Sequence, residues 1–205
     1  MAATGIVAGC ASNDTDAASG DDSTPADHDR SDDGTRRATL VTTLGEIEVT
    51  LYGDRAPRTV DNFVGLATGD RSWTDPETGR TIEDQPLYED LSFYRITAGY
   101  LIEGGDPTDT GHGGPGHQLD REFHEDLRHD DAGILSMATE GEHSSGSRFF
   151  MTLDAQPHLD DRHSVFGSVI DGMDVVEAIG SVSTDAYNRP TVDIVLESVT
   201  IDGGA

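Results

Sequence analysis

The strongest indication of the fold is the stretch FYRITAGYLIEGGDP (residues 93–107), read together with GSRFF (146–150) further along the chain. The first stretch places Arg95 among apolar and aromatic residues, and a glycine-dense loop follows it. The second is an apolar strand that ends in paired phenylalanines. No cysteine, serine or metal-ligand cluster nearby has the spacing of a covalent or hydrolytic site. A fixed cation beside an apolar pocket suits a reaction that needs charge placement without bond cleavage.

Further motifs follow in order at 111–116, 133–138, 146–151, 158–167 and 172–179. Together with 93–107 they resemble the cyclophilin family of peptidyl-prolyl isomerases, over roughly residues 38 to 201. A lone glycine-rich run means little, whereas several ordered motifs are specific. The resemblance implies isomerisation of X–Pro bonds in proline-containing polypeptides, which assists protein folding without cofactor or metal. It also implies a closed eight-stranded antiparallel β-barrel capped by an α-helix at each end.

The alternation of apolar and polar residues independently predicts a mainly β protein. Residues 46–52 alternate as a half-buried strand does, and Gly45 joins them to 39–44 in a tight hairpin. Pro57 begins a helix whose apolar residues recur at helical spacing until Gly69. The other expected elements are a long loop at 70–90, short strands at 92–97, 100–103, 134–138, 149–153, 165–170 and 192–201, and a second helix from Asp171. Many short strands with two helices favour a closed antiparallel barrel.

Arg95 is the candidate catalytic residue. The barrier to amide rotation is ~18–20 kcal/mol because the C–N bond has partial double-bond character. A donor that favours a lone pair on the prolyl nitrogen lowers this barrier, and a guanidinium is such a donor because it stays protonated. The resemblance gives Arg95 this role, since it stands at the position of the family's catalytic arginine. On residues alone, a surface ion pair is the alternative in so acidic a chain.

The resemblance also implies an apolar slot for the proline ring and a wall that binds the substrate backbone. By pattern alone, these positions are ordinary core or strand residues. The positions that match the family's substrate site are Tyr100, Leu101, Glu103, Ala138, Thr139, Arg148, Phe150, Leu159 and His163. For His163 the expected role is packing and a hydrogen bond, without proton transfer.

The chain departs from the family pattern at several of these positions. Glu103 and Arg148 stand where cyclophilins commonly carry glutamines, and a salt bridge between them at the pocket wall would compensate the charges. Thr139 replaces an asparagine that acts through its backbone, so its identity should matter little. His158 stands where many members carry a tryptophan associated with cyclosporin binding, so we expect weak inhibition by that drug. The charge changes leave an alternative function open, a proline-binding chaperone or scaffold with little turnover.

The charge of the chain limits its partners. Thirteen basic residues, all arginine, stand against 40 acidic ones, for a net charge of −27. Such a charge repels phosphates, so we expect no nucleic-acid partner. The acids are interleaved with patterned apolar residues, which indicates a folded protein with an acidic shell. At 1 M salt the Debye length is only ~3 Å, so self-repulsion is screened, and we expect a halophilic archaeon as the source.

The N-terminal region contains a candidate lipid-attachment site. Cys10 ends the stretch IVAGC (6–10), which resembles a lipobox, and as the single cysteine it excludes an intramolecular disulfide. Residues 11–37 lack Val, Ile, Leu, Met and aromatic residues, which predicts a disordered tether. The expected division is therefore an acidic disordered segment at 1–37 and an isomerase domain at 38–203.

The sequence leaves two cellular locations as alternatives. A cell-surface lipoprotein would touch the membrane only through Cys10, and it requires a start upstream, because the segment before Cys10 is too short for a secretory signal. The other is the cytoplasm of an organism with high internal salt. In both we expect a monomer.

The loop histidines do not have the spacing of a metal site. Those considered are His112, His117, His124 and His129. They lack the arrangement of a zinc site with cysteines or of an HExxH pair, so solvated loop histidines are expected. The acidic run before Gly34 lacks the terminal glutamate of a calcium loop. Ser144, Ser145 and Ser147 lack a matching base and acid, so a serine hydrolase is not expected.

Overall fold

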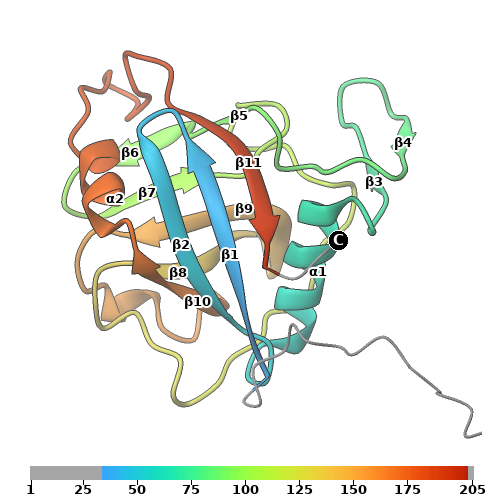
Figure 1. Ribbon diagram of the computed structural model, residues 1–205, viewed down its shortest axis with the longest axis horizontal. Helices are drawn as coiled ribbons and strands as arrows, with labels where there is room; N and C mark the ends of the chain where they lie inside the picture. The colour runs from blue at the N-terminus through green and yellow to red at the C-terminus, as the bar shows by residue number, and fades with distance from the viewer. Residues whose placement is uncertain (1–33, 203–205) are drawn as a thin grey trace, which may run out of the picture.

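A strongly curled antiparallel sheet forms the centre of the molecule (Figure 1). The structure is a computed structural model that describes residues 34–202. The strands of the main sheet are β1 (Thr35–Thr42), β2 (Gly45–Tyr52), β5 (Leu91–Ser92), β6 (Arg95–Thr97), β7 (Leu101–Gly104), β8 (Ile134–Glu140), β9 (His143–Thr152), β10 (Val165–Asp171) and β11 (Val195–Ile201). They lie in the order β5-β11-β1-β2-β10-β8-β9-β7-β6.

Two helices lie at opposite ends of this curled sheet, α1 (Pro57–Thr68) and α2 (Met173–Gly180) (Figure 1). The prediction of a mainly β protein with two α-helices is therefore confirmed. Two smaller elements were not predicted. The expected long loop contains the short hairpin of β3 (Trp73–Thr74) and β4 (Thr81–Ile82), and a 3-10 helix, η1 (Pro157–Leu159), follows β9.

The predicted closed eight-stranded barrel is wrong, because the sheet is an open, curled half-barrel. Its edges are β5 and β6, and no ladder joins them within residues 34–202. Only Phe93 and Tyr94 separate these two strands, so the chain runs on from one into the other without a turn. Phe93 N instead donates to the carbonyl of Ile194 (2.9 Å). Antiparallel closure would need a hairpin between the edges, and parallel closure a crossover of a dozen or more residues.

Two neighbouring rows of side chains across β6, β7, β9 and β8 separate the core from the outer face. The buried row is Ile96, Ile102, Met151 and Leu135. The row one residue away is Arg95, Glu103, Phe150 and Ser136. Successive side chains of a strand point to opposite faces, so the second row points away from the core. A slip of one residue would exchange the rows, and the register thus decides which side chains are available for chemistry.

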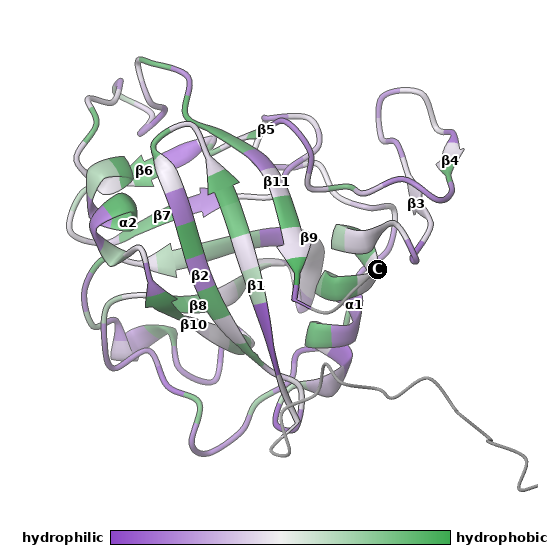
Figure 2. Cartoon of the chain, in the orientation of Figure 1, coloured by the Kyte–Doolittle hydropathy of each residue, from purple (hydrophilic) through white to green (hydrophobic). Residues whose placement is uncertain are grey.

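The core lies between the inner face of the sheet and α1. The ring of Phe63 on α1 lies 4.9 Å from that of Tyr88, 5.9 Å from that of Phe149 and 5.2 Å from that of Phe166, measured between centroids. All four side chains are buried, and burial of one such side chain contributes roughly 1.5–3 kcal/mol. Along β2, hydrophobic and hydrophilic bands alternate, as expected for a strand with one face on the core (Figure 2).

The predicted helix from Pro57 to Gly69 is confirmed, with Gly69 in the left-handed conformation (φ 83°) after its last turn. A residue far along the chain accepts a hydrogen bond from a free backbone N–H group of its first turn. Ala56 provides no side-chain cap, and the carboxylate of Glu122 accepts from the backbone N–H of Thr59 (2.6 Å) instead. The negative charge of a carboxylate at the N-terminal end also interacts favourably with the helix dipole.

The hairpin between β1 and β2 is confirmed, but its turn lies one step earlier than expected. Thr43 and Leu44 form the turn, while Gly45 begins β2 and pairs with Thr42. Glycine is needed here because φ is +139° and a Cβ would lie 2.8 Å from a methyl carbon of Val175.

The N-terminal expectations concern residues that are largely outside the described part of the chain. Cys10 and the predicted tether up to residue 33 lie outside it. The strand β1 begins at Thr35, so the end of the 11–37 segment belongs to the sheet, where Arg36 pairs with Leu51. Within residues 34–202, no helix has the length and apolar character needed to cross a membrane.

Candidate active site

A cavity of about 680 Å³ lies beside β6, β7, β8 and β9, on the outer face of the sheet. All the residues that the sequence assigned to the site line it: Arg95, Tyr100, Leu101, Glu103, Ala138, Thr139, Arg148, Phe150, Leu159 and His163. The fold therefore brings together residues that are widely separated in the chain. The volume falls in the range of ligand pockets, roughly 300–1,000 Å³.

Six further lining residues were not predicted: Tyr94, Thr110, Gly111, His112, Tyr187 and Arg189. The signal for Tyr94 was its place beside the candidate arginine. Tyr187 and Arg189 come from the loop between α2 and β11, which has no periodic pattern. They reach the cavity because Ile96 N on β6 donates to the carbonyl of Asn188 (2.8 Å) and binds that loop to the sheet edge.

One end of the cavity is apolar. Leu101, Phe150 and Leu159 form a small cluster separate from the main core, with Tyr100 packed against it. Phe149 and Phe150 thus have different functions: the first fills the core and the second faces the cavity, as the period of two along β9 requires. The short helix η1 supplies Leu159. This end therefore offers an apolar surface to a ligand in the cavity.

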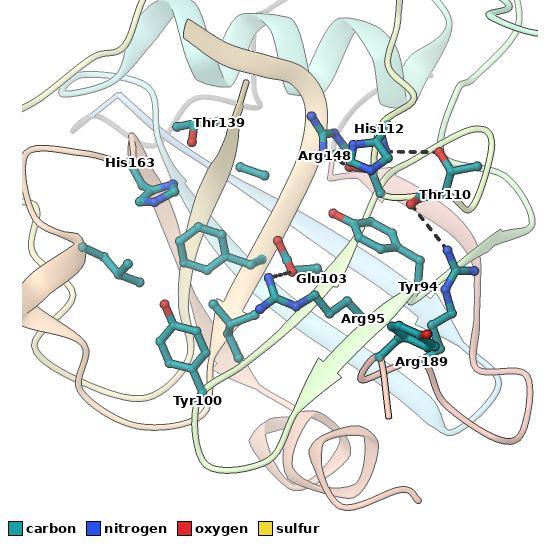
Figure 3. A pocket seen from close by; sticks show the side chains of 16 residues that line it. Tyr94, Arg95, Tyr100, Glu103, Thr110, His112, Thr139, Arg148, His163 and Arg189 are labelled. Carbon is teal, nitrogen blue, oxygen red and sulfur yellow. Dashed lines mark hydrogen bonds and ion pairs between the residues drawn. The ribbon is translucent and has the colours of Figure 1, made fainter. Parts of the chain in front are cut away.

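Arg95 lies at the middle of the cavity and is held by Glu103 (Figure 3). The two residues are directly opposite each other on β6 and β7, and Nη1 of the arginine lies 2.8 Å from Oε2 of the glutamate. The Arg95 side chain is 44 % exposed, while that of Glu103 is 12 % exposed. Within the described residues the guanidinium makes no other hydrogen bond, so its remaining N–H groups are available to a ligand.

The predicted salt bridge between Glu103 and Arg148 is wrong. In the ladder Glu103 is opposite Phe150, which leaves Arg148 diagonal to it, whereas Arg95 is directly opposite. Diagonal neighbours lie ~7–8 Å apart, so the closer arginine takes the carboxylate. Arg148 instead donates to the carbonyl of Gly111 and lies 3.4 Å from the carboxylate of Glu140.

The loop after β7 is organised around a buried carboxylate. Asp106 accepts hydrogen bonds from the backbone N–H groups of Thr108 (2.8 Å), Thr110 (3.1 Å), Gly111 (2.5 Å) and Gly113 (3.1 Å). Burial alone would raise the pKa of Asp106, but the hydrogen bonds from Thr108, Gly113 and Gly111 outweigh it and lower that pKa. This arrangement holds Thr110 and Gly111 at the wall of the cavity.

Comparison with known proteins decides the family. The family model described as cyclophilin type peptidyl-prolyl cis-trans isomerase/CLD matches residues 37–201. The chain belongs to the cyclophilin family. Among similar cyclophilins, peptidyl-prolyl cis-trans isomerase A of Mycobacterium tuberculosis is 45% identical over 169 residues, which is 82% of this chain and 92% of the relative. Peptidyl-prolyl cis-trans isomerase B of Streptomyces anulatus is 43% identical over 168 residues, 80% of this chain and 95% of the relative.

Solved cyclophilin structures agree in fold. The crystal structure of a cyclophilin type peptidyl-prolyl cis-trans isomerase of Cryptosporidium parvum has a TM-score of 0.71 and 28% identity, covering 83% of this chain and 99% of that one. The same protein in the presence of the dipeptide Ala-Pro has a TM-score of 0.70. Peptidyl-prolyl cis–trans isomerisation is therefore the activity of this cyclophilin, as the sequence predicted.

Behind the slot of this cyclophilin, a buried chain of hydrogen bonds supports Phe150. The imidazole of His129 contacts the carboxylate of Asp160 through Nδ1 (2.9 Å) and the hydroxyl of Ser136 through Nε2 (3.1 Å). Its ring is stacked on that of Phe150 at 5.9 Å and 19°. Ser136 is fully buried, so no substrate carbonyl reaches its hydroxyl. The hydrogen-bonded Asp160, His129 and Ser136 therefore position the ring of Phe150, and the Ser136 hydroxyl does not serve as a nucleophile.

The expectation of solvated loop histidines is wrong for two of the four. His129 is fully buried, and burial lowers its pKa despite the neighbouring carboxylate of Asp160. His117 is half-buried, with Nε2 2.7 Å from the side-chain oxygen of Asn62. In residues 34–202, no group of three or more His, Cys, Asp or Glu side chains is placed to hold a metal ion.

His163 completes the apolar end as a neutral ring. Its Nδ1 lies 3.1 Å from the carbonyl of Met137, and its ring meets that of Phe150 edge-on at 5.2 Å. Burial lowers the pKa of His163, which keeps the imidazole uncharged near neutral pH. Because a carbonyl only accepts, Nδ1 carries the proton and Nε2 is left as an acceptor.

A β-bulge brings the backbone of β8 to the cavity. The pairing of β8 with β9 shifts between Met137 and Thr139, so Ala138 has no direct partner. Ala138 and Thr139 both line the cavity although they are adjacent. Successive residues of a regular strand point to opposite faces, and only the irregularity allows this. No pattern in the sequence indicated the bulge.

Proposed function

We propose that Arg95 is the catalytic residue and that the proline ring binds among Leu101, Phe150 and Leu159. The observation that carries the proposal is that the Arg95 guanidinium lines the same cavity as these apolar side chains and is held by Glu103, with its other N–H groups free. A proline in the slot places its imide nitrogen within reach of this cation. The substrate class is then a proline-containing polypeptide.

The chemistry requires only a fixed donor. Rotation passes through a state in which the nitrogen lone pair is localised and can accept a hydrogen bond, which the planar amide cannot do as well. A preorganised guanidinium stabilises that state more than the ground state. No proton is transferred, which agrees with a permanently charged arginine and a neutral His163.

The test is isomerisation of a proline peptide in multimolar salt, followed by exchange NMR, for the wild type, Arg95→Lys and Arg95→Ala. Lysine keeps the charge without the planar fork, so we expect it to retain part of the rate that alanine loses. Tight binding of the peptide by the wild type without turnover would instead support the proline-binding scaffold. Equal rates for all three proteins would remove Arg95 from the mechanism.

The biological setting is a second part of the proposal. An acidic shell, a net charge of −27 and the absence of lysine fit a protein that works in concentrated salt. We propose that it assists protein folding under these conditions. We further propose that Cys10 carries lipid and that the segment before β1 is a tether. Mass spectrometry of the native N-terminus with membrane fractionation tests this, and an unmodified cysteine in the soluble fraction would refute it. Sedimentation of the purified protein tests the expected monomer.

A further inference from the structure

The side chains that line the cavity carry more positive than negative charge, whereas the chain as a whole is strongly acidic. Its lining contains the cations Arg95, Arg148 and Arg189 but only one carboxylate, that of Glu103, which Arg95 engages. The whole chain, by contrast, carries a net charge of −27. In Figure 3 the ion pair lies in the middle, with Tyr100 and His163 on one side and Arg148 and Arg189 on the other. The cavity thus has an apolar end and a cationic end.

The cation of Arg189 has no carboxylate partner in the described part of the chain. Its guanidinium donates to the carbonyls of Asp109 (3.3 Å) and Thr110 (3.5 Å). The nearby carboxylate of Asp185 accepts from the backbone N–H of Arg189 (3.0 Å) and of Tyr187 (2.8 Å), which fixes the turn that carries both residues. Two carbonyls position the guanidinium without neutralising it.

The positive charge of Arg148 is only partly neutralised by its carboxylate partner. Its side chain is 8 % exposed, and Glu140, its ion-pair partner at 3.4 Å, is 54 % exposed. The Nε–H of Arg148 is buried without any hydrogen-bond partner in the described residues. A buried donor without a partner costs about 1–3 kcal/mol, so the charge of Arg148 is incompletely compensated within the protein, and a negative charge beside it in the cavity would stabilise it.

Neutral donors complete this end of the cavity. Tyr94 lines it, and burial with the nearby charge of Glu103 raises the pKa of its hydroxyl, which therefore stays protonated. Asp106, the other acid close to it, accepts four backbone N–H groups of its own loop. The exposed ring of Tyr187 stands at the rim. The groups that a ligand meets here are donors and cations.

We propose that the cationic end binds an acidic side chain that flanks the X–Pro bond, so that this cyclophilin selects prolines next to Asp or Glu. The inference rests on the proposed function, because it is the proline in the apolar slot that directs the flanking residues over Arg148 and Arg189. A carboxylate gains charge-assisted hydrogen bonds there that a neutral amide does not. Arg148 stands where the family commonly has glutamine, so the preference belongs to this chain.

The test compares peptides that differ only in one side chain. Glutamate or glutamine is placed two residues before the proline, one before it, or one after it, and kcat/KM and Kd are measured by exchange NMR at low and at multimolar salt. For one of these positions we expect the glutamate peptide to be favoured by roughly fivefold to tenfold. In Arg189→Gln and in Arg148→Gln the ratio should fall towards one. Arg80→Gln removes the same charge from the exposed β3–β4 hairpin and should leave the ratio unchanged.

The outcomes separate the two proposals. If the wild type isomerises glutamate and glutamine peptides equally at every position, the acidic preference is overturned while the isomerase mechanism stands. If no peptide is turned over, the proposed function fails, whatever the binding ratio. If Arg148→Gln does not fold, Arg189→Gln decides alone, because Arg189 lies on an exposed loop. A ratio that Arg80→Gln lowers as much as Arg189→Gln does would show general attraction and overturn the site.

Discussion

Replacing Arg95 by alanine removes two functions at once. In the proposed mechanism the guanidinium is the donor at the slot, and in the structure it is also the partner of Glu103 at 2.8 Å. A loss of activity in Arg95→Ala alone would therefore mix a missing donor with an unpaired carboxylate. A second substitution, Glu103→Gln, separates the two effects because it removes the charge that Arg95→Ala leaves behind.

The structure sets the expected magnitudes. Loss of one aimed donor typically costs ~10²–10³ in rate. Removal of one partner costs about 3–5 kcal/mol in a buried ion pair, whereas an exposed pair is worth only about 0.2–1 kcal/mol. Glu103 is 12 % exposed but Arg95 is 44 % exposed, so solvent screens the pair from one side. We therefore expect Arg95→Ala to lower the free energy of unfolding by about 1–3 kcal/mol.

The assay is a double-mutant cycle with two readouts. Chemical denaturation gives the free energy of unfolding, and exchange NMR gives the isomerisation rate, for the wild type, both single variants and the double variant. Glu103→Gln should restore most of the stability lost in Arg95→Ala and none of the rate. A folded Arg95→Ala protein with a near-normal rate would refute the mechanism. Strictly additive stabilities would show that the ion pair does not matter in solution.

The remaining predictions address the register, the helix cap and the buried histidines. Phe149→Ala should cost about 3–5 kcal/mol of stability because its ring fills the core, whereas Phe150→Ala should mainly lower kcat/KM; equal stability losses would contradict the division of the two faces. Glu122→Gln should lower the free energy of unfolding by about 1–2 kcal/mol, measured by urea denaturation, since it removes the charged cap of α1; an unchanged midpoint would show that the cap is not needed. Burial lowers the pKa of His129 and of His163, so the unfolded chain, with a pKa of about 6.5, takes up protons first. The stability that the two neutral histidines contribute is then present above pH 6.5 and is lost as the pH falls through their lower pKa values in the folded protein. Denaturation at a series of pH values between 7.5 and 5.5 measures this loss. A free energy of unfolding that stays constant over this range, or that depends on pH equally in His129→Gln, would contradict the prediction.

Local patterns in the sequence determined the elements and the identity of most site residues. The period of two in β2, and the proline and glycine that bound α1, are short-range signals with a direct physical cause. The ordered motifs around Arg95, Phe150 and His163 identified residues that line one cavity, because each motif combines residues that one fold requires in one order.

Only the tertiary structure decided which of these residues meet. Glu103 pairs with Arg95 and not with Arg148, since the pairing of three strands, β6, β7 and β9, places one opposite and the other diagonal. The same holds for Arg189, which a loop near the C-terminus brings to the cavity, and for the buried His129. Contacts between distant segments depend on how the sheet curls and where its edges end. They arise from packing of the whole chain, and the sequence of any one segment does not contain them.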